Sequence, residues 1–467
     1  MRRKITAELE KFFASDEKKA FLLKGARQVG KTYAIEDFIF SHYDVTQTIK
    51  INFLSQPEAR YFFESDSGSF ASLDPDTIFD RITTNPNFRN VRLIPGKKIA
   101  IFLDEIQECP KAITSLKFFA LNRKKYDVYA SGSYLGFSFL NMSEGDSFPT
   151  GYTITKTLNG LDFEEFLWAV GFDENYTANL KKSIAKGTYF DDATHEKLLD
   201  LFHKYLVVGS LPAPIKSFLE TKDLNHAREI LKDLHDDYCL EMNKHLLTFS
   251  RSHTGETYSK IMAIKNKAVF DSIPSQLRQQ NKKFMYRRVA KGGRERMYID
   301  NILWLKTAGL IEEVPNVKSL TSFLDDYVIE DDFKLFCFDT GILLSQFDME
   351  ISNDILANRG DGNYAVSLCI GGIYENAVSN ILSKYLCDDK NFYFYKDDKY
   401  ELDFVYQDGH NIALIEVKSG NDLKAKSLAA LSSERNDVIP MRISQKQVKE
   451  KTFNEYSFYS FALLYSK

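Results

Sequence analysis

A run of eight residues in the first part of the chain has the sequence pattern of a phosphate-binding loop. Gly25, Gly30, Lys31 and Thr32 fit the pattern Gly-x-x-x-x-Gly-Lys-Ser/Thr. The glycines let the backbone turn so that its N–H groups point at phosphate oxygens, and the N-terminus of a following helix attracts the same anion. Lys31 would reach the β- and γ-phosphates, and the Thr32 hydroxyl would ligate Mg²⁺. The expected nucleotide-binding residues are Gly25, Ala26, Arg27, Gln28, Val29, Gly30, Lys31 and Thr32.

Two acids follow a fully apolar run at residues 99–103 and are the second candidate for chemistry. Asp104, at the end of an expected buried strand, needs a partner for its charge, and Mg²⁺ held through water is one. Glu105 would be the base that orients and deprotonates the attacking water. Ser131 and Ser133 end the next expected strand, where a hydroxyl could sense the γ-phosphate, although Ser-Gly-Ser is also common in turns. These residues predict that the chain binds ATP with Mg²⁺ and hydrolyses it.

A second group of acids lies in the C-terminal part of the sequence. Glu416 and Lys418 are two residues apart on an expected strand, so their side chains point to one face, and a hairpin brings Asp403 alongside. Two carboxylates can hold Mg²⁺, and Lys418 can position or activate a water for attack on a phosphodiester. Glu375 falls at the edge of the apolar arc of an expected helix and would be a fourth member and a further metal ligand. The alternatives are a common cross-strand charge pattern and, for Glu375, a carboxylate paired with a lysine.

Positive charge is concentrated in the segment from Arg278 to Arg296. The segment holds eight Lys and Arg residues and one acid, Glu295, in a chain whose net charge is −4. Such a segment can lie along the backbone of DNA or RNA and give salt-sensitive affinity that is independent of sequence. The alternative is a solvated face that docks on the acids between residues 325 and 332. The sequence leaves both interpretations open.

Alternating strands and helices must position these residues. Strands are expected at 20–23, 48–54, 99–103 and 126–130, with helices at 31–40 and 112–122, a pattern typical of a parallel α/β layer. The pattern is helical from residue 161 to about 265, and residues 268–315 combine short helices, the basic segment and a hairpin. A helix at 373–386 and strands at 392–396, 401–406 and 411–418 indicate a second α/β domain. Residues 141–150 are expected to form a mobile loop.

The amino-acid composition of the chain limits the classes of protein to which it can belong. With 44% apolar and 27% charged residues, the 467-residue chain has the balance of a globular protein with a large core. No apolar run reaches the ~18 residues of a membrane span, and the N-terminal residues do not resemble a secretory leader. The five cysteines are scattered and the eight histidines lack metal-binding spacing, so neither a disulfide framework nor a zinc site is expected. These features predict a cytoplasmic protein without a membrane segment.

The ordered set of motifs resembles that of the bacterial and archaeal AAA-type ATPases that carry a C-terminal domain of unknown function (family number 4143). The resemblance covers nearly the whole chain. It implies an ATP-binding domain, a middle region that is helical and then winged-helix-like, and a smaller C-terminal α/β domain with a restriction-endonuclease-like fold. The expected limits are 1–160 for the AAA-type domain, 161–265 for the helical domain, 266–332 for the winged-helix-like region and 333–467 for the nuclease-like domain. The residues that carry the resemblance are 25–32, 103–107, Cys109 and Pro110, 131–133, 161–167, 205–212, 338–343 and 416–420.

Two positions depart from the family pattern. Gly151 and Tyr152 stand where many relatives have Gly-Arg, and Gly209 is followed by a serine where relatives often have two glycines. If the arginine assists hydrolysis in relatives, this chain either lacks that assistance or uses another arginine. Arg27 and Arg123 are the candidates within the chain.

Two functional hypotheses follow. In the first, an ATPase is coupled to nucleic-acid binding or processing by the C-terminal half of the chain. In the second, the chain is a nucleotide-controlled switch that hydrolyses ATP slowly and recruits a protein partner. The nuclease-like domain would then be a catalytically inactive scaffold. Both hypotheses place ATP and Mg²⁺ at the same loop.

Overall fold

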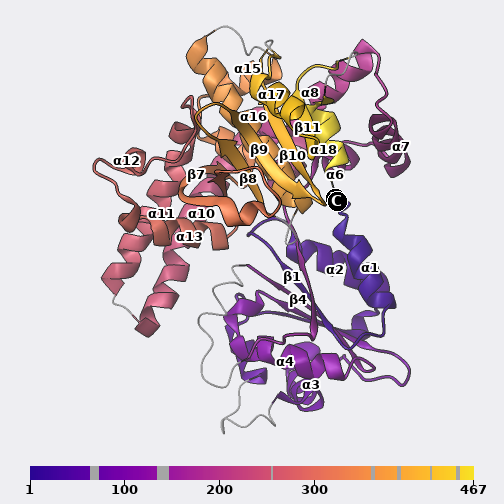
Figure 1. Ribbon diagram of the computed structural model, residues 1–467. Coiled ribbons are helices and arrows are strands. Elements are labelled where there is room, and N and C mark those ends of the chain that lie inside the picture. Colours follow the sequence, from indigo (N-terminus) through magenta and orange to yellow (C-terminus); the bar gives the residue numbers. More distant parts are fainter. Residues whose placement is uncertain are drawn as a thin grey trace. The chain divides into compact units, whose positions relative to one another are not determined.

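The computed structural model divides the chain into two compact units, Arg2–Gly160 and Leu161–Lys467 (Figure 1). It describes residues 1–63, 73–133, 147–253, 256–358, 363–386, 391–420, 423–448 and 453–466. Most of the expected loop at 141–150, namely residues 141–146, lies outside the described residues.

The first unit is built on a parallel five-stranded sheet. Its strands run in the order β2-β3-β4-β1-β5, so the strand that precedes the candidate phosphate loop is flanked by β4 and β5. The strands are β1 (Ala20–Lys24), β2 (Thr48–Asn52), β3 (Ile99–Asp104), β4 (Tyr126–Gly132) and β5 (Thr153–Thr157). The helices are α1 (Ile5–Ala14), α2 (Lys31–His42), α3 (Pro75–Thr84) and α4 (Pro110–Leu121), with short 3-10 turns at Val45–Gln47, Pro57–Phe62, Pro86–Phe88 and Ile106–Glu108. The predicted α/β layer is confirmed.

Helices cover both faces of this sheet, which explains the apolar strands. All six residues of β3 and all seven of β4 are buried, as expected for central strands of a parallel sheet. On one face, Phe12 of α1 packs against Phe21 and Tyr129. On the other face, strand residues such as Ile101 share a cluster with Leu116 and other α4 side chains. Because successive side chains of a strand point to opposite faces of the sheet, every second residue packs against the same layer of helices.

Parallel pairing brings the carboxyl ends of the strands to one edge of the sheet. Asn52 of β2 lies opposite Asp104 of β3, and Leu23 of β1 lies opposite Ser131 of β4. The loop after β1, the acids at the end of β3 and the serines at the end of β4 therefore meet at this edge, where ligands bind in open α/β sheets.

The second unit opens with a helical part. Its helices are α6 (Phe163–Ala169), α7 (Glu174–Ala185), α8 (Asp192–Val208), α9 (Pro212–Thr221), α10 (Leu224–His253), α11 (Glu256–Leu277), α12 (Tyr286–Val289) and α13 (Ile299–Thr307), with a 3-10 turn at Glu295–Met297. The start of α6 carries a capping box, because Asp162 accepts from the Glu165 amide and Glu165 accepts from the Asp162 amide.

A mixed seven-stranded sheet completes the second unit, in the order β12-β11-β10-β9-β8-β6-β7. Its strands are β6 (Ile311–Val317), β7 (Val328–Cys337), β8 (Phe392–Lys396), β9 (Glu401–Asp408), β10 (Asn411–Lys418), β11 (Val438–Ser444) and β12 (Asn454–Ser457). The remaining helices are α14 (Thr340–Ser345), α15 (Met349–Leu356), α16 (Tyr364–Leu386), α17 (Lys426–Glu434) and α18 (Phe458–Leu464), with a 3-10 turn at Leu324–Tyr327. In Figure 1, α16 runs alongside this sheet.

The hairpin expected within residues 268–315 lies later in the chain. It is formed by β6 and β7, and β6 also pairs in parallel with β8, so the hairpin belongs to the large sheet. The expected boundary between residues 332 and 333 falls inside β7. The finer division of residues 161–467, including the winged-helix-like region, stays a proposal.

Three of the motif segments meet within the second unit. Asp339 accepts hydrogen bonds from the amide and hydroxyl of Ser210 and from the Ile342 amide. The Leu161 amide donates to the Ser210 carbonyl at 2.7 Å. Gly209 has a φ of +78°, and a Cβ there would lie 2.6 Å from an Asp339 oxygen. The segments around 161, 209 and 339 are therefore joined by packing too close for a larger residue at Gly209.

Among the residues that the structure describes, none of the helices combines the length and apolar character that crossing a membrane requires.

Candidate nucleotide site and a carboxylate–lysine cluster

The loop between β1 and α2 has the backbone conformation that the motif predicts. Gly25, Gln28 and Gly30 have φ angles of +155°, +61° and +95°. A Cβ at Gly25 would lie 2.1 Å from the carbonyl oxygen of Leu158, so a side chain cannot be accommodated there. Helix α2 starts directly after Gly30, and its first N–H groups face the loop without partners inside the helix.

Lys31 is 5% exposed and its ammonium is held inside the loop. It donates to the carbonyl oxygens of Gly25 at 3.0 Å and Ala26 at 2.7 Å, and to Ser133 Oγ at 2.8 Å. Burial lowers the pKa of Lys31 to about 8 against the opposing effect of Glu105 and Asp104, and the nearby Arg27 charge lowers it further. The ammonium is therefore strongly desolvated, so an anion placed beside it would be bound tightly.

Asp104 is a buried carboxylate on which three strands and the first turn of α2 converge. It accepts from Thr32 Oγ1 at 3.0 and 3.2 Å, from Asn52 Nδ2 at 2.7 Å, and from Ser131 Oγ. Its exposure is 1%. The hydroxyl and the carboxylate that were expected to share Mg²⁺ are thus adjacent, with the carboxylate oriented by an amide and a second hydroxyl.

Glu105 lies directly beyond the end of β3 in a left-handed conformation, with φ at +51°. A non-glycine residue in this region is strained, and such strain persists mainly where the surrounding structure imposes it, often at functional sites. Gln107 Nε2 donates to Glu105 Oε2 at 2.5 Å and so orients the carboxylate. Glu105 is partly exposed, so it can meet water beside the loop.

The structure brings Lys31, Thr32, Asp104, Glu105, Ser131 and Ser133 together and adds two residues that sequence reasoning missed. Asn52 was missed as a partner of Asp104, although it ends its own strand at the same edge. Gln107 was expected only as part of a motif, without a role. The signal available for Asn52 was its place as the last polar residue of an expected strand.

Neither Arg123 nor position 152 can serve the phosphate loop of its own chain. Arg123 is buried, pairs with Asp127 and donates to the Phe12 carbonyl oxygen at 2.7 Å. Asp127 is near the start of β4, and Tyr152 precedes β5 beside Ala20, both at the sheet edge opposite the loop. The expectation for Arg123 was wrong, because its side chain extends to the carbonyl oxygen of Phe12 in α1. Arg27 stays a candidate.

The C-terminal acids also come together, but with two lysines that the sequence did not predict. Glu375, 5% exposed as a side chain, pairs with Lys282 at 2.6 Å and Lys334 at 3.3 Å. Lys334 lies 4.0 Å from Asp403, whose other oxygen accepts from the Val417 amide at 2.8 Å. Glu416 pairs with Lys418 at 2.6 Å. We call these six charged residues, Lys282, Lys334, Glu375, Asp403, Glu416 and Lys418, the carboxylate–lysine cluster.

Charges in this cluster shift one another's protonation. Burial raises the pKa of Asp403 to about 7, with Glu375 and Glu416 adding to the effect and the two lysines opposing it. Burial also raises the pKa of Glu416. Burial acts in the same direction on Glu375, but Lys282 and Lys334 outweigh it and hold the pKa of Glu375 below its usual value. Glu375 is therefore a carboxylate paired with lysines, which was the alternative to a metal ligand at this position.

Asp403 gives a pH dependence whose sign follows from its raised pKa. Between the usual value of 3.8 and about 7, the folded chain binds this proton more tightly than the unfolded chain. Its contribution to stability is complete below about pH 4 and is lost as pH rises toward 7. Asp403→Asn keeps the acceptor for the Val417 amide. It should make the slope of the free energy of unfolding against pH shallower. Urea unfolding between pH 5 and 8 measures it; an equal slope in both proteins would contradict the assignment.

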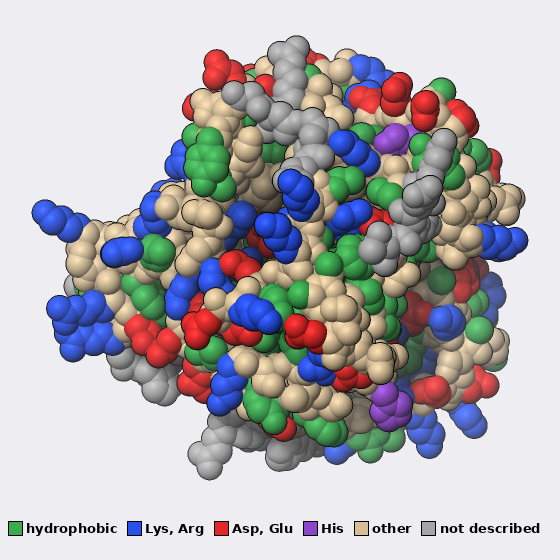
Figure 2. Space-filling view, turned by 45° about the horizontal axis from the view of Figure 1, so that its top comes forward, with side chains coloured by type: hydrophobic (Ala, Val, Ile, Leu, Met, Phe, Trp, Pro, Cys, Tyr) green, Lys and Arg blue, Asp and Glu red, His purple; other side chains and the backbone are tan. Residues whose placement is uncertain are grey.

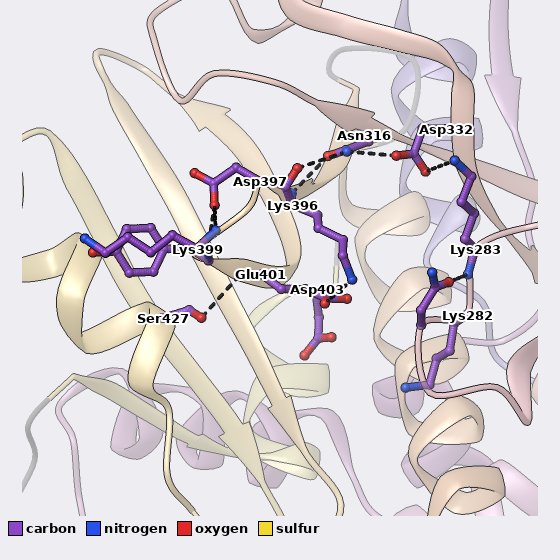
Figure 3. Close-up of polar contacts among 12 residues, drawn as sticks. Lys282, Lys283, Asn316, Asp332, Lys396, Asp397, Lys399, Glu401, Asp403 and Ser427 are labelled. Carbon is purple, nitrogen blue, oxygen red and sulfur yellow. Dashed lines mark hydrogen bonds and ion pairs between the residues drawn. The ribbon is translucent and has the colours of Figure 1, made fainter.

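The basic segment is divided between docked and exposed side chains. Lys282 enters the cluster, and Lys283 pairs with Asp332 at 3.1 Å. Figure 3 follows a line of polar contacts from Lys283 through Asp332 and Asn316 to Lys396, and places the Lys282 ammonium toward Asp403. Exposed cations remain, and Figure 2 displays Lys and Arg side chains at the left edge, on the side where Figure 1 has α12. The exposed cations of the basic segment are Arg278, Arg287, Arg288, Lys291, Arg294 and Arg296, and none of these six is ion-paired within the described part of the chain.

One further group of ligand types lies between α10 and α11. His235, Cys239 and Asp271 place their ligand atoms within 4.8 Å of one another. The Lys267 ammonium pairs with Asp271 at 2.8 Å and lies 3.6 Å from the Cys239 sulfur. Burial raises the pKa of the Cys239 thiol to about 11. We assign no metal there, because the Lys267 ammonium already neutralises the Asp271 carboxylate and lies beside the Cys239 sulfur.

A comparison with known protein families gives a match to the first unit of the chain. Residues 17–167 match a family described as an AAA domain. The chain carries an AAA domain. Residues 199–352 and 370–463 match two domains of unknown function, DUF8612 and DUF4143. No curated protein sequence matches the chain. The AAA domain thus contains the phosphate loop and its acids, while Glu375, Asp403 and Glu416 all lie within the DUF4143 match.

Solved structures resemble the chain only distantly. PCH-2 from C. elegans is 12% identical, with 40% of this chain and 47% of that chain covered and a TM-score of 0.20. AMPPCP-bound DnaA from Aquifex aeolicus is 11% identical, with 65% and 86% covered and a TM-score of 0.26. Cdc6p from Pyrobaculum aerophilum is 10% identical, with 66% and 86% covered and a TM-score of 0.24. The chain spans about half the length of the PCH-2 chain, and similarity at this level says nothing about its substrates.

Proposed function

We propose that the AAA domain binds ATP with Mg²⁺ and hydrolyses it, and that the second unit binds nucleic acid without cutting it. The observation that carries the first part is the convergence of Lys31, Thr32, Asp104 and Glu105 at the carboxyl edge of the sheet. We place the protein in the cytoplasm, since Cys109, Cys239, Cys337 and Cys369 are buried and free.

Each residue has a task in this reaction. Amides of the loop and of the first turn of α2 bind the phosphates, and Lys31 exchanges its bonds to the Gly25 and Ala26 carbonyls for phosphate oxygens. Ser133, which accepts from Lys31, lies where a hydroxyl can contact the γ-phosphate. Glu105, oriented by Gln107, takes the proton of the attacking water.

The residues around Asp104 fit Mg²⁺. Oxygen ligands are what this ion prefers, and the Thr32 hydroxyl and the Asp104 carboxylate are in contact. When bound, Mg²⁺ would neutralise charge on the phosphates and align them for attack. Asn52 and Ser131 keep the Asp104 carboxylate in place for that role. The decisive test is Mg²⁺-dependent ATP turnover by the purified chain, compared with Glu105→Gln.

The carboxylate–lysine cluster does not fit Mg²⁺ in this arrangement. Three carboxylates are matched by three lysines, and both oxygens of Glu375 are engaged by ammonium groups. A dication ligated by Glu375 would have to displace Lys282 or Lys334, both well buried. This favours the hypothesis in which the domain with a nuclease-like pattern is inactive, and we route no cleavage through Asp403, Glu416 and Lys418.

Nucleic-acid binding is assigned to the exposed cations of the basic segment. Replacing Lys291, Arg294 and Arg296 together by alanine should weaken binding of DNA or RNA regardless of sequence. The slope of log affinity against log salt should fall by about 0.9 for each phosphate that the variant no longer neutralises. Fluorescence anisotropy with a labelled duplex at several salt concentrations measures both, and the same mixtures with plasmid and Mg²⁺ should show no cleavage.

A matched control for this prediction is the triple alanine variant of Lys182, Lys186 and Lys216, which are exposed lysines elsewhere in the second unit. It should bind nucleic acid as the parent does. Equal weakening by both triples would mean diffuse charge attraction, and no binding by the parent would favour recruitment of a protein partner. ATP turnover measured with and without the duplex then tells whether the two activities are coupled.

A further inference from the structure

Arg3 reaches the phosphate loop from outside the matched AAA domain. Its guanidinium donates through Nη1 to the carbonyl oxygen of Val29 at 2.8 Å and through Nη2 to that of Asn159 at 2.6 Å. The side chain is 7% exposed. The family match begins at residue 17, so this contact is an addition to the domain by the N-terminal segment.

The segment that carries Arg3 is firmly anchored. Helix α1 begins two residues later, and Leu9 and Phe12 are buried in the sheet face formed partly by Phe21 and Tyr129. An arginine held at its backbone end and at both of its terminal nitrogens has little freedom left. Arg3 can therefore hold main-chain groups of the loop in one orientation.

The Val29 carbonyl belongs to the same peptide unit as the Gly30 amide. The described residues contain no cis peptide bond, and in a planar trans peptide the C=O and N–H vectors point in opposite directions. Fixing the Val29 oxygen on Arg3 therefore directs the Gly30 N–H away from Arg3. Within the described residues this N–H has no hydrogen-bond acceptor, whereas the amide of Ala34 already donates to the Gly30 carbonyl.

Rotation of this peptide is otherwise easy. Gly30 has a φ of +95° and lacks a side chain to restrain it. If the peptide flipped, a carbonyl oxygen instead of an N–H would face the phosphates, which would repel them.

We propose that Arg3 is a positioning residue for nucleotide binding, which orients the Gly30 amide toward the phosphates. The second bond, to Asn159, ties the loop to the end of β5, where the Leu158 carbonyl already packs against Gly25. Arg3 thereby links the loop to the segment that follows β5. The inference rests on the proposed ATP binding, and it adds a determinant that the loop motif does not contain.

The test separates positioning from simple destabilisation through the steady-state constants for ATP. An amide that binds phosphate in both the ground state and the transition state affects KM more than kcat. Arg3→Ala should raise KM for ATP by about tenfold, as expected for one charge-assisted hydrogen bond, and leave kcat within about threefold. Arg3→Lys can reach only one carbonyl and should be intermediate. Arg2→Ala, the exposed neighbour, is the matched control and should match the parent.

Each outcome decides between the alternatives. Unchanged KM in Arg3→Ala, or a lower kcat with unchanged KM as expected from a partly unfolded population, would overturn the inference. If the parent shows no ATP turnover, the proposed hydrolysis fails, and calorimetric affinity for ADP gives the same comparison among the variants. If Arg3→Ala does not fold, Arg3→Lys carries the test, because it must still raise KM.

Discussion

Replacing Glu105 by glutamine is expected to lower ATP turnover by at least about a hundredfold, the usual contribution of a general base. Glutamine keeps the shape of the side chain but cannot take the proton of the attacking water. ATP affinity should stay within about twofold of the parent, because Lys31 and the loop amides are unchanged. Release of phosphate under single-turnover conditions measures the first quantity, and titration with a fluorescent ATP analogue measures the second.

Glu108→Gln is the control for this prediction. Glu108 follows three residues later and pairs with Arg60 at 3.0 Å, so its loss changes the local charge equally without touching the water. Its turnover should equal that of the parent. A Glu105→Gln variant that turns over ATP normally would exclude Glu105 as the base. A variant that no longer binds ATP would mean that the carboxylate supports the loop instead.

Replacing Lys334 by alanine should lower the free energy of unfolding of the second unit by about 3 kcal/mol. Lys334 is 2% exposed and Glu375 5%, so the substitution leaves a buried carboxylate short of one partner. The effect is placed at the lower end of the range for breaking buried pairs because Lys282 remains. Both tryptophans, Trp168 and Trp304, lie in this unit, so urea unfolding followed by tryptophan fluorescence reports on it alone.

Lys396→Ala removes an exposed partner and serves as the control. Lys396 and Glu401 are 38% and 39% exposed, and such surface pairs contribute about 0–1 kcal/mol. If Lys334→Ala were as stable as Lys396→Ala, the cluster would not be held by its ion pairs. A dication could then replace a lysine at little cost, and a metal site among these acids would become feasible.

Much of the fold was predictable because it depends on local patterns. The strand at 99–103 is a continuous apolar run, and β8, β9 and β10 lie where alternation and turn residues place them. The hairpin was placed too early, within residues 268–315, a range that also holds the basic segment around residues 286–298. In the structure this segment forms short turns, and the strands start at Ile311, where the apolar residues resume.

The candidate nucleotide site was also predictable in outline. Its loop is contiguous in sequence, so spacing alone specifies it. Asp104, Glu105, Ser131 and Ser133 could be placed because parallel strands end at one edge of a sheet. The roles of Asn52 and Gln107 could not be predicted, because each residue acts through another side chain and no motif spacing assigns it a role.

By itself the sequence determined which groups exist for chemistry: a turn of amides with its lysine, two acids at a strand end, and three further acids with a nearby lysine. The tertiary structure alone decided which charges are matched. Lys282 and Lys334 meet Glu375 across separations of 93 and 41 residues, and Arg3 meets Asn159 across 156. Such pairings depend on how distant elements pack, and a desolvated charge accepts whichever opposite charge or carbonyl that packing supplies.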